Sequence, residues 1–193
     1  VGSGIMGQNL SSNDSLTLLA NTLATVFALY FLITIFGDHS SHFNPVVSMV
    51  MLVRKEISTQ VCTVFIILQI SGAILGVMLA NYIFELDPVY FSEKPRSGTH
   101  LFVSEILATF GLLMVILLSS KEKVAVTVAA YIGAAYWFTS STSFANPAGT
   151  IGRSFSNTFA GISTNDILHF CVAQIIGAFL ALFVYKTFFE SQK

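Results

Sequence analysis

Long apolar runs without charged residues dominate this sequence and most constrain how it can fold. No Asp, Glu, Lys or Arg occurs in four of these runs, which are residues 16–36, 57–84, 124–140 and 167–185. A fifth run, residues 101–120, contains a single charged residue, Glu105. A helix that crosses the hydrocarbon core of a bilayer needs roughly 20 predominantly apolar residues. We therefore predict an all-α membrane protein with five complete transmembrane helices over these ranges.

The composition supports a membrane protein and excludes several other classes. Charged residues make up 10% of the chain, against about 25% in a typical soluble domain, so membrane lipid is the expected partner. The net charge of −1 leaves no basic face for nucleic acid. No zinc, P-loop or dinucleotide motif is present. Cys62 and Cys171 each lie inside an apolar run and are predicted to be free thiols.

Basic residues mark alternate loops between the predicted spans. Lys and Arg are enriched on the cytoplasmic side of membrane proteins. The segments after the first, third and fifth spans carry most of them here: Arg54, Lys55, Lys121, Lys123, Lys186 and Lys193. All three segments lie on one face if every predicted helix crosses the bilayer, so we assign that face to the inside.

Two shorter segments, residues 44–53 and 146–155, each begin with Asn-Pro. Asn is a preferred N-cap, and Pro is preferred at the first helical position. A helix of ten residues is about 15 Å long, half the thickness of the hydrocarbon core. We therefore predict two half-helices, the first entering from the inside and the second from the outside.

The two halves of the chain repeat the same pattern. Asn44-Pro45-Val46 matches Asn146-Pro147-Ala148, and a Gln-Ile-x-Gly-Ala motif occurs at residues 69–73 and 174–178. The half-repeats are residues 1–85, which lack one span, and residues 99–188. An odd number of spans separates the two half-helices, so the halves are inverted and the half-helices meet at the midplane. Irregular backbone at that depth is tolerated where it lines a watery cavity, which indicates a pore.

On these residues the chain resembles the aquaporin or major intrinsic protein family, whose signature is a pair of Asn-Pro-Ala boxes on half-helices. The family has six spans, and residues 1–6 resemble the end of the first, so we expect an N-terminally incomplete sequence. The resemblance implies one channel domain over residues 1–193, with no enzymatic activity and no cofactor. It also implies a homotetramer in the inner or plasma membrane, with one pore per subunit.

The resemblance assigns a role to each box and to one buried acid. The amides of Asn44 and Asn146 are expected to line the pore and to donate hydrogen bonds to passing solutes, while Pro45, Val46, Pro147 and Ala148 complete the boxes. Glu105 is expected to be a structural acid that accepts hydrogen bonds from the backbone near the second box. A proton path through Glu105 is the alternative.

The expected selectivity filter departs from the water-selective pattern. Its positions, carried over by spacing, are Thr25, Ala134, Ser143 and Gly149, where narrow family filters use bulky residues and an arginine after the second box. We expect Arg153 to make a helix-end or loop contact, which leaves no fixed cation at the filter. The predicted channel passively conducts water and larger neutral solutes, such as glycerol, urea or arsenite, and resembles the bacterial branch associated with arsenic resistance.

Other interpretations remain open at this point. A secondary transporter with broken helices is the main alternative, and a strict water channel is another. His39 and His42 precede the first box and are expected to have a loop role, with a pH gate as the alternative. An intramembrane enzyme would need a nucleophile with its base, or a metal cluster, and neither pattern is present.

Overall fold

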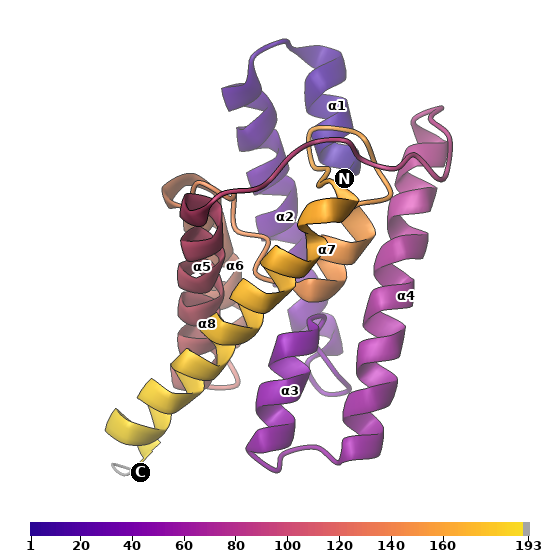
Figure 1. The fold of residues 1–193 in the computed structure, drawn as a ribbon. Coiled ribbons are helices and arrows are strands. Elements are labelled where there is room, and N and C mark those ends of the chain that lie inside the picture. Colours follow the sequence, from indigo (N-terminus) through magenta and orange to yellow (C-terminus); the bar gives the residue numbers. More distant parts are fainter. Residues whose placement is uncertain (191–193) are drawn as a thin grey trace.

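The computed structural model describes residues 1–190, and Lys193 lies outside them. Within this part of the chain all regular secondary structure is helical, apart from an isolated β-bridge between Tyr90 and Ser156. Figure 1 shows the helices in chain order: α1 (Gly2–Leu10), α2 (Asp14–Phe36), α3 (Pro45–Val53), α4 (Thr59–Ile83), α5 (Thr99–Leu118), α6 (Val124–Phe138), α7 (Pro147–Arg153), the short 3-10 turn η1 (Thr164–Asp166) and α8 (Ile167–Phe188).

The long helices have the lengths and compositions of membrane spans. α2, α4, α5 and the continuous stretch Thr164–Phe188 are each long and apolar enough to cross a bilayer. The all-α membrane fold predicted from the sequence is therefore confirmed. α6 is shorter, with 15 residues and a length of about 22 Å. It ends at Phe138 rather than near residue 140, because Thr139 turns into extended backbone that leads to the second Asn-Pro box.

Two short helices lie end to end in the middle of the molecule. α3 has nine residues and α7 has seven, so they are about 14 Å and 10 Å long and neither can cross a bilayer. Figure 1 shows α3 below α7, between α4 and α8, with their N-terminal ends facing each other. α7 ends at Arg153, two residues before the predicted end of the second half-helix at residue 155.

Side-chain caps begin α2, α3, α4 and α7, whereas α1, α5, α6 and α8 begin without one. The side chains of Asn13 and Ser58 cap α2 and α4 as hydrogen-bond acceptors. From the sequence, Thr164 or Asn165 is the expected N-cap of the last span, but both lie in η1, which the Ser163 side chain caps instead. The first helix is also longer than predicted, since α1 continues past residue 6 to Leu10 before the chain turns into α2.

Residues 84–98, called the strap here, join α4 to α5 and cross over the carboxyl end of α7, which lies on the predicted outer side (Figure 1). The backbone N–H of Tyr90 donates to the Phe155 carbonyl at 3.2 Å, and that of Ser92 donates to the Ser154 carbonyl at 2.8 Å. The buried side chain of Asn81 also donates to the Phe155 carbonyl, at 2.8 Å. The strap and the end of α4 therefore together hold the loop that follows α7.

The matching glycines of the repeat differ in their surroundings. A Cβ on Gly177 of α8 would meet backbone atoms of α5, including the Phe110 nitrogen at 3.0 Å, whereas a Cβ on Gly72 of α4 would meet nothing within 4 Å. Only a residue without a side chain lets α8 approach α5 this closely.

We expect Gly177→Ala to destabilise the fold by about 1–3 kcal/mol, because the added methyl group overpacks the contact between α5 and α8. The matched variant Gly72→Ala should unfold at the wild-type temperature or slightly above it, since Ala is the better helix former. Thermal unfolding in detergent distinguishes the two. Equal loss in both variants would contradict the packing explanation.

Candidate functional site

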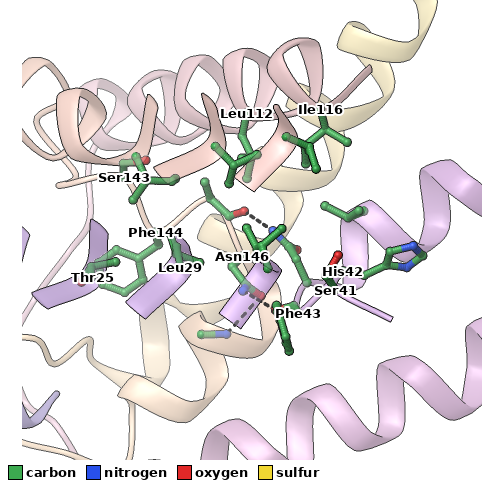
Figure 2. A pocket seen from close by; sticks show the side chains of 18 of the residues that line it. Thr25, Leu29, Ser41, His42, Phe43, Leu112, Ile116, Ser143, Phe144 and Asn146 are labelled. Carbon is green, nitrogen blue, oxygen red and sulfur yellow. Dashed lines mark hydrogen bonds between the residues drawn. The ribbon is translucent and has the colours of Figure 1, made fainter. Parts of the chain in front are cut away.

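The tips of the two half-helices are joined by a reciprocal pair of hydrogen bonds. The Asn44 Nδ2 donates to the Ala145 carbonyl at 2.7 Å, and the Asn146 Nδ2 donates to the Phe43 carbonyl at 2.9 Å. Each asparagine thus binds the residue that precedes the other, and each amide retains a second N–H. Figure 2 shows Asn146 and Phe43 together beside the cavity. The two boxes, far apart in sequence, form one unit.

The same asparagines cap their own helices. The Asn44 Oδ1 accepts from the Val46 N–H at 3.2 Å, and the Asn146 Oδ1 accepts from the Ala148 and Gly149 N–H groups at 3.0 and 3.3 Å. With Oδ1 used for the cap, Nδ2 points away from the helix and toward the opposite box. The N-terminal ends of both helices carry partial positive charge, which therefore concentrates where they meet.

Both loops reach their asparagine through a left-handed residue. Phe43 has φ 49° and Ala145 has φ 48°, and Thr142 and Ser143 in the second loop also have positive φ. Non-glycine residues rarely adopt this conformation, which costs on the order of 1 kcal/mol or more per residue. The turn presents the carbonyls of Phe43 and Ala145 to the opposite asparagine, so the surrounding contacts must stabilise it.

Glu105 supplies much of that stabilisation for the second loop. Its side chain is fully buried. Oε1 accepts from the Ser141 hydroxyl at 2.5 Å and the Phe144 N–H at 2.9 Å, and Oε2 accepts from the Ala145 N–H at 2.8 Å and the Gln174 Nε2 at 2.7 Å. Four donors satisfy one carboxylate, which faces the loop. Glu105 is not among the residues that line the cavity.

The repeat extends to a glutamine behind each half-helix. The Gln174 Nε2 donates to the Thr150 hydroxyl of α7 at 2.9 Å, and the Gln69 Nε2 donates to the Ser48 hydroxyl of α3 at 3.0 Å. Ser48 is also bonded to the His42 Nδ1, at 3.1 Å. His42 is thus tied to α3 at the predicted inner end of the cavity.

A cavity of about 280 Å³ runs past the paired boxes. Figure 2 shows Ser41 and His42 toward one end, Thr25 and Ser143 toward the other, and Asn146 between them. Most of the wall is apolar, with polar groups confined to the two ends and the boxes. The lining residues contributed by α2, α5 and α6 are Thr25, Leu29, Ile33, Leu112, Ile116, Val124, Val128, Ile132 and Tyr136. A passage with apolar walls and few fixed donors suits small uncharged solutes.

The predicted filter positions divide into two groups. Thr25, Ser143 and Gly149 line the cavity. Ala134 does not line the cavity, and its side chain is exposed, so the prediction that it is a filter residue is wrong. The lining residues of α6 recur every four positions from Val124 to Tyr136, so Ala134 lies on the opposite face of the helix. Tyr136 takes its place in the wall, and its hydroxyl lies 3.2 Å from the Thr25 hydroxyl.

The outer end of the cavity also differs from the expectation that no fixed cation is present. Arg153 lines the cavity. It does make the expected loop contact, since its Nε donates to the Ala160 carbonyl, yet its guanidinium also lies over the Phe144 ring, with Cζ 3.4 Å from the centroid. Spacing within the box motif pointed to Gly149 and missed Arg153. The sequence feature that could have indicated Arg153 is its distance of four residues from Gly149, which places both residues on one face of α7.

A second arginine nearby has a structural role. Arg96 of the strap is buried and donates from Nε to the Gly161 carbonyl at 2.7 Å and from a terminal nitrogen to the Ser141 carbonyl at 3.3 Å. Burial lowers the pKa of its guanidinium to about 10, which still leaves it charged at neutral pH. Arg96 therefore joins the strap to the loop before α7, at Ser141, and to the loop after α7, at Gly161.

Known proteins match the chain along nearly its whole length. The family model described as "Major intrinsic protein" matches residues 1–185. The chain is also 46% identical over 186 residues to "Aquaglyceroporin AqpS" of Rhizobium meliloti (strain 1021), an alignment that covers 94% of this chain and 80% of that protein. Both matches span the two Asn-Pro boxes and the cavity between them.

Proposed function

Because this chain belongs to the major intrinsic protein family, we propose that it is a wide-filter channel that passes glycerol, urea or arsenite as well as water. The coarser function is that of the family, an integral multi-pass membrane channel for small neutral solutes. A relative that carries the name aquaglyceroporin supports a solute larger than water.

The observation that carries the proposal is the absence of a side chain at Gly149, which lines the cavity. A Cβ built on Gly149 would meet no atoms nearer than those of Asn146, at 3.6 Å or more. The residue after the second box therefore adds no side chain to the wall, and Thr25 and Ser143 at this end are small, whereas Tyr136, Phe144 and Arg153 form the bulky part of the wall. A solute with several heavy atoms has more room here than it would beside a long side chain.

Polar groups in the cavity match the hydroxyl groups of such solutes. Asn44 and Asn146 each have an amide N–H not used between the boxes. The Ser143 hydroxyl is buried, lines the cavity and has no hydrogen-bond partner among the described residues. A buried hydroxyl without a partner costs about 1–3 kcal/mol, which a passing solute or water can relieve.

Osmotic swelling of liposomes that hold the purified channel tests the proposal. Glycerol, urea and arsenite fluxes should exceed those of protein-free liposomes and rise linearly with concentration, because an open passage has no saturable site. Permeability to water alone would favour the strict water channel. Flux that saturates or follows an ion gradient would favour the transporter.

We also propose that the channel is a homotetramer in the cell membrane. The resemblance to the family supports this assembly, and so do the outward faces of α2 and α4, which carry exposed apolar side chains: Leu19, Leu23, Phe27, Tyr30, Val64, Ile67, Leu75 and Leu79. Faces of this kind contact lipid or a neighbouring subunit. The molar mass of the detergent-solubilised protein, from light scattering, tests the tetramer.

A further inference from the structure

We propose that Arg153 is the fixed cation of this pore, placed one helical turn beyond the position that Gly149 leaves empty, and that it excludes cations from the channel. This makes Arg153 a specificity-determining residue. The inference rests on the proposed channel activity, though not on the identity of the solute.

The position of Arg153 follows from the geometry of α7. Residues four apart lie on the same face of a helix, and four residues advance the chain by about 6 Å. Arg153 therefore continues the pore-facing row of Gly149 toward the outer end of the helix, and both residues line the cavity. A long side chain can reach a lumen that a glycine at the nearer position leaves open.

Two contacts hold the guanidinium in place and leave most of its donors free. Nε donates to the Ala160 carbonyl, and the planar group stacks on Phe144, itself a lining residue. Among residues 1–190, this is the one hydrogen bond that the guanidinium makes. Its terminal N–H groups, four of the five donors, are available to water or to a solute in the cavity.

The charge of Arg153 has no carboxylate beside it. Within the described part of the chain, the ion pairs involve Arg54 and Lys121 only, and no acid lies within 4 Å of Arg153. Glu105, the buried acid of this region, accepts the four hydrogen bonds already described with its two carboxylate oxygens. Arg96 adds a second positive charge over the Phe144 ring, with Cζ 4.8 Å from the ring centroid.

The outer end of the pore is therefore positive, and its apolar wall weakens screening of that charge. A cation that enters meets a like charge at close range in a medium less polar than water, which opposes its passage. A neutral solute meets only hydrogen-bond donors. The missing side chain at Gly149 and the exclusion of cations are thus compatible, because the positive charge lies at Arg153, one turn further out along α7.

The direct test compares Arg153→Ala with wild type in liposomes that contain a pH-sensitive dye. We expect proton and methylammonium permeability to rise about tenfold or more in Arg153→Ala, with glycerol flux retained. Arg153→Lys should restore exclusion, because it restores the charge without the planar group. Lys121→Ala is the control, since it removes one positive charge from an exposed ion pair with Asp38 outside the cavity, and it should behave as wild type.

Arg153→His provides a pH-dependent form of the same test, and is useful if Arg153→Ala folds poorly. A histidine has an ordinary pKa of about 6.5, so the methylammonium leak should be present at pH 8 and should close as the pH falls to 5. The nearby titratable or charged groups are the amino group of Val1, Lys94 and Arg96 of the strap, Tyr136 of α6 and Glu105 of α5, and the wild-type channel over the same pH range controls for all of them. The same control covers His42, which also lines the cavity.

The outcomes separate this inference from the proposed solute class. A folded Arg153→Ala channel as tight to cations as wild type would overturn the inference, and so would a pH-independent Arg153→His channel. If wild type passes water but no glycerol, the wide-filter proposal fails, yet a cation leak in Arg153→Ala would still establish the role of Arg153.

Discussion

Gly149→Arg is expected to reduce glycerol and urea flux by more than about tenfold while water still passes, because a long side chain would enter the cavity at a position that now carries none. A Cβ at this position fits without a clash, since its nearest atoms belong to Asn146 at 3.6 Å. The new guanidinium would lie one turn inward of Arg153. Swelling assays with each solute, normalised to water flux in the same liposomes, measure the change.

Gly149→Ala is the matched control for this variant. It adds a Cβ to the same place without length or charge, and it should keep glycerol flux near the wild-type value. Unchanged glycerol flux in a folded Gly149→Arg channel would show that residue 149 does not limit the pore. The proposal of a filter widened at this position would then be wrong.

Glu105→Leu is expected to prevent stable folding. The change removes the acceptor of two backbone N–H groups, those of Phe144 and Ala145, and leaves the Ser141 and Gln174 donors without their carboxylate. Removing one partner from a buried charged network costs about 3–5 kcal/mol, which is a large share of the stability of a typical domain. The yield of monodisperse protein and its thermal unfolding in detergent report the loss.

Glu105→Gln separates the structural role from a proton path. A glutamine keeps the size of the side chain and one acceptor oxygen, but its NH₂ group would face a donor, so we expect intermediate stability. Its glycerol flux, per folded channel, should equal that of wild type. A stable Glu105→Gln protein that lost a proton-dependent flux would favour the proton path instead.

Much of the architecture is predictable because it depends on local patterns. The long apolar runs, which contain no charged residue except Glu105, predict α2, α4, α5 and α8 to within a few residues at most ends, since span length is set by the bilayer and not by neighbouring helices. The half-helices α3 and α7 are also predictable, because Asn at the N-cap and Pro at the first helical position act within one turn.

The filter is less predictable because it depends on how each helix is rotated about its axis. Spacing from the second box selects Ala134, yet the row that faces the lumen runs through Ile132 and Tyr136. Hydrophobic periodicity gives little help in α6, where nearly every residue is apolar and no face is distinguished by polarity. Packing against α2 and α5 decides the rotation.

The sequence alone determined that this is a membrane protein with two capped half-helices in inverted repeats, because composition, length and capping are properties of short segments. Only the tertiary structure decided which side chains meet in the lumen. The reciprocal bonds of Asn44 and Asn146, the four donors on Glu105 and the reach of Arg153 past Gly149 all join segments distant in sequence or depend on side-chain direction. The proposed charge and width of the pore rest on those contacts.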